Sequence, residues 1–175
     1  HGIRSGLDYP SPIAYACNVQ GGDHTSVAGE IPPDFMTFMD SAVICAFNLV
    51  RPREVVWEFF RAVTGWDITM EEWNSVMAPR MLTIQRTLLL IGGPDVKWDP
   101  RVDDDNPPRF YEPLPSGPKA GQAADRKEVE RRKKEWFNYL GWDELGIPTS
   151  ETLRKLGLED LDKALEPIRE RYKAV

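Results

Sequence analysis

The chain has 175 residues, of which 41% are hydrophobic and 29% charged, so it is long enough to bury a core and too apolar to be wholly disordered. Its formal net charge of −6 argues against a nucleic-acid binder, which usually carries a basic surface. No apolar run approaches the ~20 residues that span a bilayer, and residues 1–9 lack a signal-peptide pattern, so we expect a cytoplasmic protein without a membrane partner.

Cysteine and histidine are scarce. The two cysteines, Cys17 and Cys45, do not form a C-x-x-C pair, and His24 is the one histidine besides the first residue. Zinc and iron–sulfur sites usually need several cysteine or histidine ligands. Any metal chemistry therefore requires ligands from outside this chain.

Three segments are predicted in the first part of the chain, beginning with a loop region over residues 1–33 that is rich in glycine, proline and small polar residues. From Phe35 to Leu49, apolar residues recur every three or four positions, which predicts a helix of about four turns. A second helix is predicted for Arg53–Thr64. Its buried face is expected to comprise Val56, Phe59, Phe60 and Val63.

The third helix is predicted to begin at Thr69, which forms a capping-box pattern with Glu72, and to reach Ile91. Pro79 lies inside this stretch and cannot donate a backbone hydrogen bond. We therefore expect the helix to kink or split near Met77.

Proline dominates the next part, residues 94–118, which contain seven of the fifteen prolines and are predicted to form an extended segment over the surface. Residues 119–175 are predicted to form C-terminal helices that pack on the same helical domain as residues 34–93. No stretch shows sustained period-two alternation, so the predicted class is all-α and multihelical, without a substantial sheet.

Asp40 lies in an apolar stretch, where a carboxylate needs either solvent or a donor, because an unpaired buried charge is costly. It is either a surface residue paired with an arginine or an acceptor for N–H groups of a bound ligand. Cys45 lies five positions later, about 140° around an unbroken helix with ~3.6 residues per turn. The two side chains face one site only if the helix loosens between Val43 and Cys45; otherwise Cys45 is a core residue.

His24 follows two glycines, which let the backbone approach a ligand closely, and an imidazole is suited to proton transfer near neutral pH. It is either a catalytic group or an ordinary loop histidine. The acidic run Asp103–Asp105 lacks the glycine of a calcium loop, so a solvated acidic turn is expected there.

Five segments, in order along nearly the whole chain, resemble motifs of the aldehyde:ferredoxin oxidoreductase family of tungsten-pterin enzymes. Gln20–His24 resembles the RGxDH loop of that family, and Asp40–Cys45 resembles its DxxGLC motif. Ala62–Asp67 resembles the family's ATGW segment, which precedes acidic residues. Arg109–Pro118 resembles its RF…EPLPxGP segment, and Gly141–Leu158 resembles its closing GWDxxGxPT…LGL segment.

The resemblance implies that this chain is the C-terminal helical portion of a longer tungsten- or molybdenum-pterin oxidoreductase. Its activity would be two-electron oxidation of an aldehyde to the carboxylic acid, with ferredoxin or another electron carrier as acceptor. The N-terminal portion of the same polypeptide would grip the bis-molybdopterin (tungstopterin) cofactor and supply a C-x-x-C-x-x-x-C run. Residues 1–33 would face the cofactor, and the chain alone is expected to be inactive and to bind none of these groups.

The resemblance also implies roles for individual residues. Cys45 would be the fourth ligand of a [4Fe–4S] cluster, and Asp40 would accept hydrogen bonds from pterin N–H groups. Ile44 and Cys45 would contact the pterin. The loop positions Gln20 and Ser26 would approach it as well.

His24 would lie near the tungsten as a proton donor or acceptor. The sequence departs from the family at several places: Val43 replaces the glycine of DxxGLC, Gln20 replaces the arginine of the loop, Ala78–Pro79 replaces a Gly-Glu pair, and the segment from His24 to Asp40 is shorter. A β-branched residue resists the unusual backbone angles that a loosened helix requires. These departures leave two alternatives open: a non-catalytic all-α interaction module, or a family member that acts on a non-aldehyde substrate.

Overall fold

The computed structural model describes residues 13, 15–17, 19, 33–45 and 53–173, except for the side chains of Pro33 and Asp34. Within these residues the regular structure is helical, which confirms the predicted all-α class. The elements, in chain order, are α1 (Pro33–Ser41), α2 (Arg53–Thr64), α3 (Met70–Glu72), a π-helical turn (Trp73–Met77), α4 (Ala78–Ile91), a 3₁₀ turn (Pro108–Tyr111), α5 (Arg126–Tyr139), α6 (Ser150–Lys155) and α7 (Glu159–Lys173). None of the described helices is long and apolar enough to cross a membrane.

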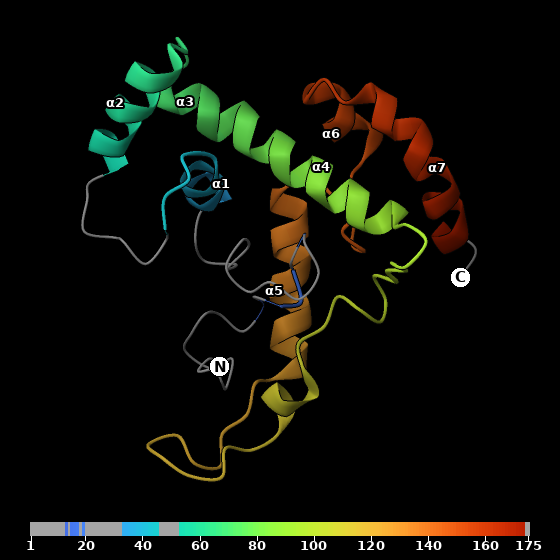
Figure 1. The fold of residues 1–175 in the computed structure, drawn as a ribbon. Coiled ribbons are helices and arrows are strands. Elements are labelled where there is room, and N and C mark those ends of the chain that lie inside the picture. The colour runs from blue at the N-terminus through green and yellow to red at the C-terminus, as the bar shows by residue number, and fades with distance from the viewer. Residues whose placement is uncertain (1–12, 14, 18, 20–32, 46–52, 174–175) are drawn as a thin grey trace.

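Helix α4 runs through the centre of the molecule (Figure 1). Helices α1 and α2 lie near its N-terminal end, α7 lies near its C-terminal end, and α5 crosses beneath it. Both α1 and α7 pack directly against α4. The central helix therefore connects the segment around Asp40 to the C-terminal helices.

The long helix after Thr69 is divided, as the position of Pro79 predicts. The Thr69 hydroxyl accepts the backbone N–H of Glu72 at 3.1 Å, and the Glu72 carboxylate accepts the Thr69 N–H at 2.7 Å. Residues Trp73–Met77 then form the π-helical turn, and α4 begins at Ala78 with Pro79 in its first turn. Proline is tolerated in a first turn because its fixed φ already suits a helix.

Three clusters of buried side chains hold the helices together. The first packs residues before α1 against α4 and α5, and the second lies between the C-terminal half of α4 and the helices α6 and α7. The third joins α1, α2 and the start of α4 through Phe38, Val56, Trp57, Trp73 and Ala78. This third cluster positions the segment that contains Asp40.

Helix α2 has the predicted bounds but not the predicted burial. Val56 and Trp57 are buried, whereas Phe59 is 62% exposed and Val63 is 85% exposed. The apolar spacing identified one face of the helix, but only part of that face packs on described residues of this chain. The uncovered part borders the candidate site.

Candidate functional site

The DxxGLC-like segment begins in the last turn of α1 and leaves it through a left-handed turn. The Ile44 backbone N–H donates to the Met39 carbonyl at 2.9 Å, and the Val43 N–H donates to the Asp40 carbonyl at 3.1 Å. This pair of bonds is the Schellman pattern, in which the residue that follows the helix adopts a positive φ. Val43 occupies that position with a φ of 56°.

The helix predicted from Phe35 to Leu49 is therefore shorter than its apolar spacing indicated, and α1 ends at Ser41. The spacing misses the stop because glycine is the usual residue at such a turn, whereas valine gives no local signal for a left-handed conformation. The backbone still takes the conformation that a glycine at position 43 would favour. Residues 46–49 lie outside the described part of the chain.

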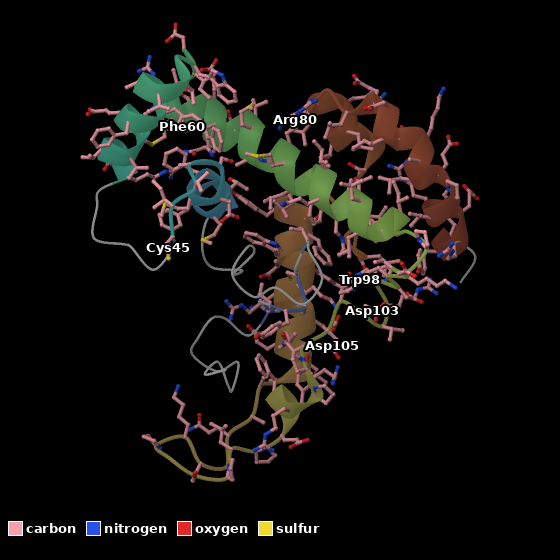
Figure 2. The ribbon with its side chains drawn as sticks, viewed as in Figure 1. Cys45, Phe60, Arg80, Trp98, Asp103 and Asp105 are labelled. Atoms are coloured by element: carbon pink, nitrogen blue, oxygen red, sulfur yellow. The ribbon has the colours of Figure 1, made fainter. Side chains whose placement is uncertain are left out.

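Ending the helix at Ser41 leaves Asp40 on helical backbone and Cys45 on the irregular segment that follows. Both residues are exposed. Figure 2 shows Cys45 at the outer end of the segment that leaves α1. The loosening that a shared site requires is present at Val43, and the alternative of Cys45 as a core residue is wrong.

Packing on two sides fixes this turn in place. Phe38 is fully buried, and its ring centroid lies 5.2 Å from that of Trp57 and 5.6 Å from that of Trp73. The Ser41 hydroxyl donates to the sulfur of Met81, in α4, at 3.7 Å. The position of the turn therefore depends on α2, on the π-helical turn and on α4.

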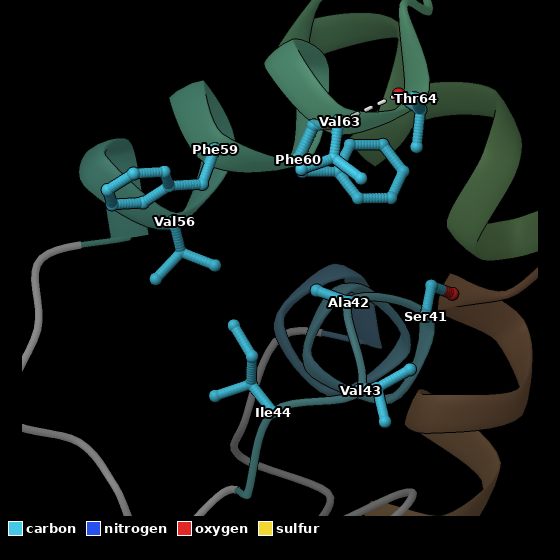
Figure 3. Close-up of a pocket in the computed structure, with 9 residues that line it drawn as sticks. All are labelled: Ser41, Ala42, Val43, Ile44, Val56, Phe59, Phe60, Val63 and Thr64. Atoms are coloured by element: carbon cyan, nitrogen blue, oxygen red, sulfur yellow. Dashed lines mark hydrogen bonds between the residues drawn. The ribbon is translucent and has the colours of Figure 1, made fainter.

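An apolar groove of about 490 Å³, here called the turn groove, lies between the turn and α2 (Figure 3). Its main walls are Val43 and Ile44 from the turn, and Val56, Phe59, Phe60 and Val63 from α2. Thr64 also borders it, and the Thr64 hydroxyl donates to the Phe60 carbonyl at 2.8 Å. None of the described residues that line the groove carries a charge, so it suits contact with an apolar surface.

Cys17 has the opposite surroundings to Cys45. It is fully buried in the cluster that packs on α4 and α5. Burial raises the pKa of its thiol, and the carboxylate of Asp104 adds to the rise. The Cys17 thiol is therefore protonated at neutral pH, whereas metal ligation uses the thiolate. Of the two cysteines, Cys45 is the one that a group outside this chain can reach.

Three residues of the predicted site, Gln20, His24 and Ser26, lie outside the described part of the chain. Among the residues that are described, no group of three or more histidine, cysteine or carboxylate side chains is arranged to hold a metal ion. Cys45 supplies one ligand, so a metal centre here takes its other ligands from elsewhere.

A buried ion pair that sequence reasoning missed holds the Pro-rich segment against α4. Arg86, in α4, donates from Nη1 to Oδ1 of Asp104 at 2.8 Å, and both side chains are almost completely buried. Asp104 also accepts from Nε1 of Trp98 at 2.9 Å, and Nε of Arg86 donates to the Gly146 carbonyl at 2.9 Å. Lys133, in α5, donates to the backbone carbonyl of Asp104 at 2.7 Å.

The expected solvated acidic turn is therefore wrong for Asp104 and Asp105. Asp104 is 2% exposed, and Asp105 accepts the Tyr111 hydroxyl and pairs with Arg126 at 2.6 Å. Partial burial acts to raise the pKa of Asp105, but the hydrogen bonds from Tyr111 and Arg126 outweigh it and hold that pKa below its ordinary value. These carboxylates join the Pro-rich segment to α4 and α5, which is a structural role.

Residues 12–158 match the family described as "Aldehyde ferredoxin oxidoreductase, domains 2 & 3". Over 177 aligned positions, the chain is also 49% identical to a Pyrococcus furiosus protein named "Aliphatic sulfonate oxidoreductase, WOR-like subunit". That alignment covers 98% of this chain and 28% of the relative, so the chain spans about 28% of the relative's length. The family match includes the turn at Val43, the turn groove and the buried Arg86–Asp104 pair.

Proposed function

We propose that this chain, which belongs to the aldehyde ferredoxin oxidoreductase family, is the C-terminal helical part of a cytoplasmic tungsten-pterin oxidoreductase that carries a [4Fe–4S] cluster. The observation that carries the proposal is the Asp40–Cys45 segment. There the spacing of the family's DxxGLC motif coincides with an exposed carboxylate, a left-handed turn and an exposed thiol.

The donor atoms of this segment suit both groups. Thiolates are the usual protein ligands of iron in [4Fe–4S] clusters, and we assign Cys45 as the fourth ligand. The other three thiolates are assigned to the N-terminal portion of the same polypeptide. When bound, the pterin-held metal supplies two-electron chemistry and the cluster supplies one-electron transfer to an external carrier.

Asp40 is assigned to accept hydrogen bonds from the N–H edge of the pterin. Its carboxylate lies in the last turn of α1, where the negative end of the helix dipole disfavours an anion by about 0.3–1 kcal/mol. Donors on a bound pterin would offset that cost and hold the pterin against the turn. Ile44, directly before Cys45, is assigned to contact the same ring system.

His24 is assigned to hold the proton that the substrate exchanges, because an imidazole accepts and returns a proton near neutral pH. Gln20 and Ser26 are assigned to approach the pterin from the same loop. The similarity of Gln20–His24 to the RGxDH loop of the family supports these roles. With glutamine at position 20, the loop contacts the pterin without the positive charge of an arginine.

The first candidate reaction is oxidation of an aldehyde. An aldehyde and a water molecule yield a carboxylic acid, two protons and two electrons, and the electrons pass to ferredoxin or another carrier. The name of the matched family supports this assignment.

The second candidate is a family member with the same cofactors that acts on a substrate other than an aldehyde. The relative in Pyrococcus furiosus favours it, because that protein is named an aliphatic sulfonate oxidoreductase subunit and is 49% identical to this chain. The non-catalytic alternative is disfavoured, since the left-handed turn is retained although valine makes it costly.

The test uses the full-length protein, purified without oxygen, in which tungsten, molybdenum and iron are measured by mass spectrometry. Reduction of ferredoxin or of a viologen dye is then followed with aldehydes and with aliphatic sulfonates as separate substrates. Reduction that depends on an aldehyde supports the first candidate, and reduction that only a sulfonate sustains supports the second. A protein that contains neither pterin-bound metal nor iron contradicts both.

A further inference from the structure

The side chain of Trp73 joins α1 to α2. It lies in the π-helical turn and is 1% exposed. Its ring centroid lies 5.6 Å from that of Phe38, in α1, and 6.0 Å and 5.8 Å from those of Trp57 and Phe60, in α2. All three contacts are edge-to-face, which is a geometry that aromatic pairs prefer. The orientation of α1 therefore depends directly on this one ring.

The π-helical turn gives Trp73 its direction. The backbone N–H of Ala78 donates to the carbonyl of Trp73, five residues earlier, whereas an α-helix pairs residues four apart. The additional residue rotates the side chains before the turn by about 100° relative to those after it, compared with a continuous α-helix. With this offset, Trp73 packs on α1 and α2, while Arg86, farther along, pairs with Asp104. Single π-helical turns of this kind are frequent at functional sites.

The indole N–H of Trp73 is buried and has no hydrogen-bond partner among the described residues. A buried donor without an acceptor is destabilising, and a phenylalanine at this position would avoid that cost. The contribution of Trp73 therefore comes from the size and shape of its ring, which reaches Phe38, Trp57 and Phe60 at once.

We propose that Trp73 is a positioning residue for the iron–sulfur cluster and acts through Phe38 and the end of α1. The inference rests on the proposed function, in which Cys45 is a ligand of that cluster. Phe38 directly precedes Met39, whose carbonyl accepts the N–H of Ile44. That bond closes the helix immediately before Cys45. A displacement of the Phe38 ring therefore moves the backbone that carries the ligand.

The other side-chain contact at the end of α1 is weaker than the aromatic one. The Ser41 hydroxyl donates to the sulfur of Met81 at 3.7 Å, and a thioether is a poor acceptor. The aromatic contacts of Phe38 therefore provide the main restraint on this end of the helix. Groups that orient the ligands of a metal centre tune its properties, and the potential of an iron–sulfur cluster is sensitive to its surroundings.

The test compares Trp73→Phe with Trp142→Phe in the full-length protein, purified without oxygen. Trp142 is 2% exposed and packs on Phe137, with the centroids 5.9 Å apart, in the cluster of buried side chains between α4 and α5. Each substitution removes a buried indole, so a purely structural role predicts similar behaviour for the two variants.

We expect only Trp73→Phe to change the electron paramagnetic resonance spectrum of the reduced cluster. At the midpoint potential of the wild type, it should change the ratio of reduced to oxidised cluster at least about threefold, which is about 28 mV for a one-electron couple. Phe38→Leu tests the same path from the other side of the contact, and serves as the second variant if Trp73→Phe does not fold. The double variant should add little to either change, because both substitutions act on α1 through one contact.

A Trp73→Phe protein with the spectrum and potential of the wild type contradicts the proposal. An equal shift in Trp142→Phe also contradicts it, because the effect is then a general consequence of destabilisation. Strictly additive shifts for Trp73→Phe and Phe38→Leu contradict the path through Phe38. Iron analysis separates these results from the proposed function: normal iron with an unchanged potential overturns only the positioning role, whereas a wild-type protein without iron overturns both.

Discussion

The backbone N–H of Ile44 donates to the carbonyl oxygen of Met39 at 2.9 Å, so α1 is closed by the residue immediately before Cys45. The direction in which the cysteine leaves the helix is therefore set by a capping bond. Val43, the left-handed residue before Ile44, affects both properties of this segment: its backbone angles determine the stability of the turn and the position of the proposed ligand Cys45.

Replacing Val43 with glycine should stabilise the 175-residue chain. Glycine avoids the left-handed penalty of roughly 1–2 kcal/mol. Its greater conformational freedom in the unfolded chain reduces this stabilisation by about 0.4–1 kcal/mol. We expect Val43→Gly to raise the free energy of unfolding by about 1 kcal/mol. The control Val63→Gly, inside α2, should lower it by about 0.5 kcal/mol. Urea unfolding followed by circular dichroism measures both, and a destabilised Val43→Gly variant would contradict the left-handed turn.

Removing one partner of the buried Arg86–Asp104 pair should be strongly destabilising. Asp104→Ala leaves a buried guanidinium without its carboxylate, at a cost of about 3–5 kcal/mol. Adding Arg86→Met removes that charge and should recover part of the loss. Urea unfolding of the two single variants and the double variant gives the coupling energy between the two positions. Strictly additive losses would show that the two side chains do not act as a pair.

An alanine substitution should destabilise the protein far more at Gly146 than at Gly65. The two glycines have similar positive φ angles, 67° at Gly146 and 70° at Gly65. A Cβ atom at position 146 would lie 2.8 Å from Nη2 of Arg86 and 2.8 Å from the ring of Phe137. A Cβ atom at position 65 would have no other atom within 4 Å. Both variants pay the backbone cost of roughly 1–2 kcal/mol, and Gly146→Ala adds about 1–3 kcal/mol for overpacking. Equal unfolding midpoints for the two variants would be inconsistent with the packing around Arg86.

Stability should fall in acid. The hydrogen bond from Arg169 lowers the pKa of Asp162, and Asp105 has a lowered pKa because its hydrogen bonds outweigh the effect of burial. A carboxyl whose folded pKa lies below its ordinary value of 3.8 binds fewer protons when folded, so it contributes stability above that pH. That contribution is lost as the pH falls through the folded-state pKa.

We therefore expect the thermal unfolding midpoint to drop progressively below about pH 4. Arg169→Met removes the donor to Asp162 and should make this acid loss smaller. The measurement is a series of thermal unfolding curves between about pH 6 and about pH 3. A midpoint that stays constant, or rises, on acidification would show that these carboxyls are not stabilised by folding.

The features that were predicted correctly depend on residues close together in the sequence. The bounds of α2 follow from its apolar spacing. The division of the long helix follows from Pro79, ten residues after the Thr69 cap, because proline is tolerated in the first turn of a helix but not in its interior. Each signal is complete within a few turns of chain. Local pattern alone is enough for elements of this kind.

Features that depend on distant contacts escaped prediction. Nothing local distinguishes Asp104 from the aspartates on either side, and its burial is decided by Arg86, 18 residues earlier. The exposed Phe59 and Val63 were expected in the core, since periodicity identifies a face but not what covers it. At the candidate site, the family motif located Cys45, while the turn that exposes it needed a left-handed valine that no propensity indicates.

The central claim is that Cys45 is a ligand of an iron–sulfur cluster, and its most direct test is electron paramagnetic resonance of the reduced full-length protein together with its iron content. Cys45→Ala is compared with the wild type and with Cys17→Ala, which removes the buried thiol instead. We predict that Cys45→Ala loses the reduced-cluster signal and most of the iron, whereas Cys17→Ala keeps both. A Cys45→Ala protein with the spectrum and the iron content of the wild type would contradict the claim.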